Sequence, residues 1–263
     1  MGALTIIADV LEVVVLIGAA IHLFSHAGES EGHSPAVMLG FAYTVVSVSN
    51  LYWIAHELMT REAIYEFSAI DIASAGFYIL FGASLAMVIG RRDKIDVHAF
   101  AIAGVIAVAQ SAMWIVWAGS WFKNALGGLP VWYATYYVIL ASWETRAVPN
   151  AGRFAVVLSA VVVTAVQVCG GTIPAFARFI PLLDIIDGPI CLIAAAVIDL
   201  TLLGSWRAEN SLEKTVALAF LGVLWTWSAM FLMYEPFYSI FHIISIAQMA
   251  LAALAVTRWV EQQ

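Results

Sequence analysis

Charged residues are scarce in this sequence. Asp, Glu, Lys and Arg make up 11% of its 263 residues, whereas hydrophobic residues make up 63% and the mean hydropathy is +0.94. A soluble domain carries about 25% charged residues, because a surface that faces water needs them. No polar stretch is long enough to fold separately in water. The composition therefore excludes a soluble catalytic or DNA-binding module and predicts one integral membrane domain over residues 1–263, with the lipid bilayer as its surroundings.

Lysine is rarer still, with only Lys94, Lys123 and Lys214, all in predicted loops or at helix ends. Retinal and PLP each form a Schiff base with a lysine amine inside the binding pocket. We therefore expect no retinal or PLP Schiff base. Basic residues as a whole are outnumbered, and the net charge of −7 argues against nucleic acid as a partner.

Cysteine and glycosylation signals are also nearly absent. The two cysteines, Cys169 and Cys191, lie inside apolar runs and are expected to be buried small hydrophobic residues rather than a disulfide or a metal site. No Asn-x-Ser/Thr acceptor occurs. This absence favours the plasma membrane of a bacterium or archaeon.

Hydrophobic runs dominate what remains. A helix needs about 20 apolar residues to cross the hydrocarbon core, and turn and charge signals divide the chain into nine such runs. The sequence predicts an all-α, polytopic transmembrane helical bundle with spans near residues 4–26, 36–58, 66–90, 97–121, 129–145, 153–175, 178–204, 212–234 and 236–260. The fifth run is short and rich in polar aromatic residues, so eight spans are the first fallback and seven the second.

The basic residues predict the orientation, because Lys and Arg collect in cytoplasmic loops. With nine spans, three basic residues fall on the side of the amino terminus and eight on the other side. The three are Arg61, Lys123 and Arg178; the eight are Arg91, Arg92, Lys94, Arg146, Arg153, Arg207, Lys214 and Arg258. We therefore expect the amino terminus outside and the carboxyl terminus in the cytoplasm. The first run has no positive n-region, which predicts a retained span rather than a signal peptide.

Six acidic residues lie inside predicted spans, with no Lys or Arg at similar depth. They are Asp9, Glu12, Asp71, Asp184, Asp187 and Asp199. Ionisable groups in the bilayer cost at least a few kcal/mol when they face lipid, so they are expected to face the interior. At about 1.5 Å per residue, all except Asp199 lie roughly 5–15 Å below the outer helix ends, as do His56 and His242. We expect them to share an acidic cavity reached from outside.

Two of the acidic pairs have i,i+3 spacing, which presents both carboxyl groups on one helix face. Asp9 and Glu12 form the first pair, and Asp184 and Asp187 form the second. Pro181, Gly188 and Pro189 flank the second pair, and broken helices often line ion sites in transporters. We therefore expect an interrupted helix with Asp184 and Asp187 as the primary ion site. A simple proline kink with hydrogen-bonded carboxyl groups is the alternative.

Histidines supply candidate metal and cofactor ligands. His22 and His26 have the i,i+4 spacing of a metal-binding pair near the end of the first span. His56 and His242 lie at similar depth and could bind one metal ion or the two faces of a haem iron. Ordinary buried histidines are the alternative for both.

The sequence around three of these residues resembles the ceramidase and adiponectin-receptor superfamily of membrane hydrolases. The resemblance rests on His56 at the end of the second span, Asp71 in the third, and Phe241-His242 to Gln248 in the last. It implies a zinc-dependent lipid hydrolase. In this chain Tyr238 stands where the family has the first of the two histidines of the last helix, and Tyr52 where it has the serine of the second helix.

Three functions follow as hypotheses. The first is a membrane protein that binds or transports a cation, proton or cationic small molecule, with Asp9, Glu12 and Asp71 as coupling carboxylates. The second is a haem-, pigment- or quinone-binding subunit of an oxidoreductase complex with other membrane subunits, in which Trp114, Trp117, Trp225 and Trp227 stack on the cofactor. The third is the zinc hydrolase.

Overall fold

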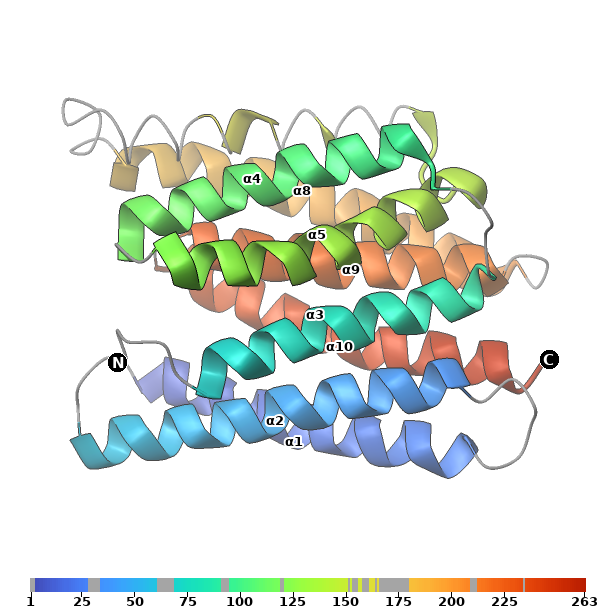
Figure 1. Ribbon diagram of the computed structural model, residues 1–263, viewed down its shortest axis with the longest axis horizontal. Helices are drawn as coiled ribbons and strands as arrows, with labels where there is room; N and C mark the ends of the chain where they lie inside the picture. Colours follow the sequence, from blue (N-terminus) through green and yellow to red (C-terminus); the bar gives the residue numbers. More distant parts are fainter. Residues whose placement is uncertain are drawn as a thin grey trace.

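The computed structural model of the protein is a bundle of α-helices that run roughly side by side (Figure 1). It describes residues 3–27, 34–60, 69–90, 95–118, 121–150, 180–208, 212–233 and 235–263, together with isolated residues between 151 and 179. The helices are α1 (Ala3–His26), α2 (Ser34–Thr60), α3 (Ala69–Val88), α4 (Val97–Ala118), α5 (Trp121–Glu144), α8 (Ile180–Arg207), α9 (Leu212–Leu232) and α10 (Phe237–Val260). No β-strand occurs in these residues, which confirms the all-α prediction.

Five of the described helices are long and apolar enough to cross a membrane. They cover Ile6–His26, Pro35–Thr60, Ala69–Val88, Ile185–Arg207 and Phe237–Val260. Their outward faces are also apolar: on α1, Ile7, Val14 and Ile21 recur every seven residues and are each more than 60% exposed. Hydrophobic side chains exposed in this regular way suit lipid rather than water. The protein is thus an integral membrane protein of the helical type.

Most helix boundaries agree with the hydrophobic runs, but two predictions were wrong. The fifth helix begins at Trp121 rather than at residue 129, because the helix continues through Gly127, Gly128 and Pro130. The helix that carries Asp187 is also unbroken: α8 runs through Pro189, and Pro181 lies in its first turn, where a missing N–H breaks no helical hydrogen bond. Membrane helices tolerate such residues because neighbouring groups satisfy the freed carbonyls. The predicted span 153–175 lies almost entirely outside the described residues.

Helix α9 lies at the centre of the bundle and contacts α3, α5, α8 and α10 (Figure 1). The first and last helices, α1 and α10, pack against each other and run in the same direction. Two contacts fix this direction: Glu12 meets His242 near the starts of the two helices, and His26 lies 3.5 Å from Glu261 near their ends. The interface between α1 and α10 is therefore the place where residues from the two ends of the sequence combine.

Candidate functional site

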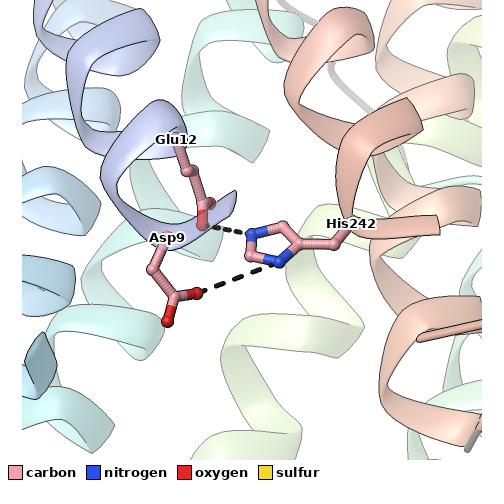
Figure 2. Close-up of side chains that lie close together, drawn as sticks. All are labelled: Asp9, Glu12 and His242. Atoms are coloured by element: carbon pink, nitrogen blue, oxygen red, sulfur yellow. Dashed lines mark hydrogen bonds and ion pairs between the residues drawn. The ribbon is translucent and has the colours of Figure 1, made fainter. Parts of the chain in front are cut away.

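Three ionisable side chains meet between α1 and α10, and we call them the carboxylate–histidine cluster. Asp9 and Glu12 project from one face of α1, as their i,i+3 spacing predicts, and His242 projects toward them from the second turn of α10 (Figure 2). One ligand atom from each residue lies within 4.8 Å of the other two. Among the described residues, this is the one group of three His, Cys, Asp or Glu side chains close enough to hold a metal ion.

The cluster is withdrawn from the protein surface. Asp9 is 8% exposed, Glu12 is 6% exposed and His242 is 2% exposed. Burial of two carboxylates together is costly unless positive charge or hydrogen bonds compensate them. The described part of the chain places no Lys or Arg in contact with the cluster, and the imidazole or a bound cation can supply positive charge there.

The two nitrogens of the His242 ring face different carboxylates (Figure 2). Nε2 lies 2.9 Å from Oε2 of Glu12, a hydrogen-bond distance. An ionised carboxylate can only accept, so with Glu12 ionised Nε2 carries the proton. Nδ1 lies 3.9 Å from Oδ1 of Asp9, too far for a hydrogen bond, and has no hydrogen-bond partner among the described residues. When His242 is neutral, its Nδ1 therefore directs a lone pair at Asp9, and a proton or a metal cation between the two atoms would make this arrangement favourable.

The distance between these two atoms is close to that between two ligands of one metal ion. Zinc binds imidazole nitrogen and carboxylate oxygen at about 2.0–2.2 Å in tetrahedral geometry, which places two of its ligand atoms about 3.4 Å apart. The observed 3.9 Å is longer, so the two side chains must move closer by a fraction of an ångström to hold one ion. Glu12, which accepts from Nε2, then stands where metal-binding histidines usually have a carboxylate partner that fixes the ring. If a metal ion binds here, Asp9 and Nδ1 of His242 would be its ligands and Glu12 would fix the orientation of the ring.

The predicted pair of His22 and His26 lies at the opposite end of the interface between α1 and α10. The rings of His22 and His26 are 4.4 Å apart between centroids, but Nδ1 of His26 lies 2.8 Å from the backbone oxygen of His22. Its Nε2 faces Glu261 at 3.5 Å. Both nitrogens of His26 thus already have neighbours, and a shared metal ion would have to displace one of them.

His56 and Asp71 lie where α2 ends and α3 begins. Nδ1 of His56 is 3.2 Å from the hydroxyl of Thr60, and its ring lies 6.2 Å from that of Tyr52, so these contacts stay within α2. Asp71 occupies the first turn of α3. His56 is therefore not grouped with His242 in the described contacts, although the haem and hydrolase hypotheses both pair them.

The predicted primary ion site lies on α8. Asp187 is buried there, and the next residue, Gly188, packs against the ring of Phe237 at the start of α10. The side chain of Asp184 lies outside the described residues, so the pairing of the two acids stays a prediction.

The tryptophans proposed to stack on a cofactor divide into two groups. The side chains of Trp114 and Trp117 lie outside the described residues. Trp227 is buried with its ring 4.5 Å from that of Phe77, and Trp225 donates from Nε1 to the backbone oxygen of Cys191. Trp225 and Trp227 therefore make contacts typical of helix packing.

The sequence did not predict a second polar group, which joins α8, α9 and α10. Nε2 of Gln248 donates to Oδ1 of Asp199 at 2.8 Å, and its Oε1 accepts from the hydroxyl of Thr226 at 2.9 Å. We call these three residues the glutamine cluster. A signal was present in the sequence, because a Gly222/Thr226 pair at i,i+4 gives α9 a small, polar face at which a neighbouring helix can approach.

No family model, curated protein or solved structure matches this chain. The geometry of its side chains is therefore the basis for the functional argument.

Proposed function

We propose that this protein binds a divalent transition-metal cation inside the membrane, through Asp9 and His242, and that this is the loading site of a cation transporter. The proposal rests mainly on the 3.9 Å separation between Nδ1 of His242 and Oδ1 of Asp9. That nitrogen is buried and has no hydrogen-bond partner among the described residues. A bare imidazole nitrogen and a carboxylate oxygen are suitable ligands for zinc, manganese, iron or cobalt.

Charge balance supports a divalent rather than a monovalent ion. Asp9 and Glu12 supply two negative charges, and His242 is neutral when its Nδ1 binds a metal. A divalent cation therefore neutralises the buried cluster, whereas a monovalent one leaves a net negative charge in the apolar interior. Imidazole is also a poor ligand for alkali metal ions, which prefer oxygen.

The topology that we propose with this function has nine crossings, with the amino terminus outside and the carboxyl terminus in the cytoplasm of a bacterial or archaeal cell. An odd number of crossings is supported by the parallel course of α1 and α10. The outside position of the amino terminus is supported by the distribution of three basic residues against eight. The carboxylate–histidine cluster then lies in the outer half of the bilayer, near the starts of α1 and α10.

The decisive experiment measures metal binding by the purified full-length chain in lipid nanodiscs. Calorimetric titration with Mn²⁺ and Zn²⁺, followed by elemental analysis, should give about one ion per chain for the wild type and none for His242→Ala, since the ligand nitrogen is gone. His56→Gln is the matched control, because it also removes a helical histidine but leaves the cluster intact. Equal binding by His242→Ala and the wild type would contradict the proposal, whereas loss of binding in His56→Gln would favour the hydrolase hypothesis.

A transport assay tests the second half of the proposal. Liposomes that contain the wild type should take up the metal that binds in nanodiscs, and Asp9→Asn should reduce this uptake at least as strongly as it reduces binding. Binding without uptake would restrict the function to a membrane metal-binding protein.

A further inference from the structure

The glutamine cluster connects three helices deep in the bundle. Asp199 belongs to α8, Gln248 to α10 and Thr226 to α9. Thr226 and Gln248 are buried, and Asp199 is half-buried. The amide of Gln248 makes one hydrogen bond of 2.8 Å to Asp199 and one of 2.9 Å to Thr226, which are the lengths of well-formed bonds. The amide therefore has a defined orientation when Asp199 is ionised.

The hydroxyl of Thr226 has two acceptors at 2.9 Å and a third, the backbone oxygen of Val223, at 3.4 Å. It can donate to Oε1 of Gln248 at 2.9 Å or to the backbone oxygen of Gly222, also at 2.9 Å. A hydroxyl has one proton and can accept as well as donate. Thr226 can therefore serve as a donor to Gln248 in one arrangement and as an acceptor from Gln248 in another, without losing its own acceptor.

A reversed amide gives the cluster a second fully hydrogen-bonded arrangement. If a proton binds to a carboxylate oxygen of Asp199, the new O–H can donate to Oε1 of Gln248 once the amide has turned by about 180°. Nε2 then donates to the Thr226 hydroxyl, which donates to the oxygen of Gly222. Every polar group keeps a partner in both arrangements, so Asp199 can gain or lose a proton without leaving an unpaired buried group.

The sequence provides room for this movement. A Cβ atom on Gly222 would lie 2.8 Å from Oε1 and 3.0 Å from Nε2 of Gln248. Any larger residue at this position would therefore press on the amide. Glycine leaves both ends of the amide free of that contact, whichever end faces Thr226.

The glutamine cluster shares helix α10 with the proposed metal site. His242, Ser245 and Gln248 follow one another at intervals of three residues, and all three are buried. Gln248 lies six residues beyond His242, which corresponds to about 9 Å along the helix axis. In the proposed orientation the glutamine cluster is thus the more cytoplasmic of the two.

Among the described residues, no charged side chain forms an ion pair with Asp199. Gln248 faces it from α10, and Thr226 on α9 lies behind Gln248. On the cytoplasmic side of Asp199 in the proposed orientation, the charged residues described on these three helices lie toward the helix ends. They are Arg207 on α8, Glu213 and Lys214 on α9, and Arg258 on α10. Arg258 donates to the backbone oxygen of Trp206. His242 and Asp187 lie toward the opposite ends of α10 and α8.

We propose that Asp199 is a proton-binding site on the inner part of the cation path, and that the amide of Gln248 reverses when Asp199 gains or loses its proton. The proton comes from water, forms an O–H bond on Asp199 and returns to water when that bond breaks. The role in a cation path rests on the proposed function, but the proton site itself stands on the hydrogen bonds of Asp199, Gln248 and Thr226.

The test is infrared difference spectroscopy of the reconstituted full-length chain between high and low pH. We expect a carboxylic-acid C=O band to appear at low pH together with a paired band of a side-chain amide. Labelling all aspartates with ¹³C should move the acid band to lower frequency, and Asp199→Asn should abolish it. Asp96→Asn, which alters a carboxyl group just before the start of α4, is the control and should leave the band in place. Gln248→Leu should keep the acid band but raise its frequency, because the O–H loses its acceptor.

Each result has a defined meaning. An acid band that persists in Asp199→Asn would overturn the proton site. If that variant does not fold, the labelled wild type decides: a spectrum without an aspartate acid band would overturn the proton site as well. An acid band without the paired amide band would overturn the reversal of Gln248. The same samples are titrated with Mn²⁺ and Zn²⁺: if the wild type binds neither, the proposed function fails while the proton site is judged by its spectra alone.

Discussion

Glu12 and His242 are separated by 230 positions in the sequence, yet the carboxylate oxygen of Glu12 lies 2.9 Å from Nε2 of His242. This hydrogen bond joins the first and last helices, and with Glu12 ionised it places a proton on Nε2. When the ring is neutral, the opposite nitrogen, Nδ1, then faces Asp9 with its lone pair. One contact between the first and last helices thus orients the imidazole of the proposed metal site.

The two carboxylates of the cluster should have unequal effects on metal affinity. Asp9→Asn replaces a charged ligand and should lose most of the binding. Glu12→Gln replaces the charged acceptor of Nε2 by a neutral amide oxygen, and mutation of such a partner typically lowers metal affinity roughly 10- to 100-fold. Titration of both variants with Zn²⁺ gives the comparison. The assignment is wrong if Glu12→Gln abolishes binding while Asp9→Asn leaves it unchanged.

Metal binding should release protons. Without a metal, a proton on the cluster offsets its negative charge, and a metal ion at Nδ1 must displace it. The apparent affinity should therefore fall as the pH falls, and calorimetry in buffers with different ionisation enthalpies should show about one proton released per ion. Binding heats that are the same in all buffers would exclude this exchange.

The sequence predicted the helices better than it predicted which residues meet. The last helix was expected at residues 236–260 and is found at Phe237–Val260, because its apolar run ends sharply at polar residues on both sides. Proline and glycine misled the prediction for α5 and α8, since they signal breaks in water but are tolerated in membrane helices.

The site shows the same division. Asp9, Glu12 and His242 could each be identified because an ionisable residue in an apolar run is rare and costly. Their meeting could not be predicted, because it depends on α1 packing against α10, and no periodicity within a single helix records its neighbours. The sequence grouped His242 with His56 because both lie at a similar depth in the membrane. Depth does not determine which helices are neighbours in the bundle.

Gly222→Ala should disturb the glutamine cluster without altering any of its polar groups. The added Cβ would lie 2.8 Å from Oε1 of Gln248, so the amide must shift from Thr226 or from Asp199. Overpacking of this kind typically costs about 1–3 kcal/mol in the free energy of unfolding. Thermal unfolding in detergent should show a lower midpoint. Gly18→Ala is the control, because nothing lies within 4 Å of its added Cβ, and it should leave the midpoint equal or higher.

Gly188→Ala should weaken metal binding from a distance. A Cβ on Gly188 would lie 2.5 Å from carbons of the Phe237 ring, and a rigid ring cannot give way as a flexible side chain can. Phe237 is the first residue of α10, so the displacement reaches the turn that carries His242. Zinc titration should show reduced affinity. Gly204→Ala on the same helix meets nothing within 4 Å and should bind as the wild type does.

The parallel course of α1 and α10 makes the topology testable with two single cysteines. In a chain whose Cys169 and Cys191 are replaced by alanine, Glu235→Cys lies before the start of α10 and Gln262→Cys lies beyond its end. Both positions are exposed. With the amino terminus outside and nine crossings, a membrane-impermeant thiol reagent added to intact cells should label Glu235→Cys alone, and Gln262→Cys should react only after the membrane is opened. Labelling of Gln262→Cys in intact cells would reverse the orientation, and the carboxylate–histidine cluster would then load its cation from the cytoplasm.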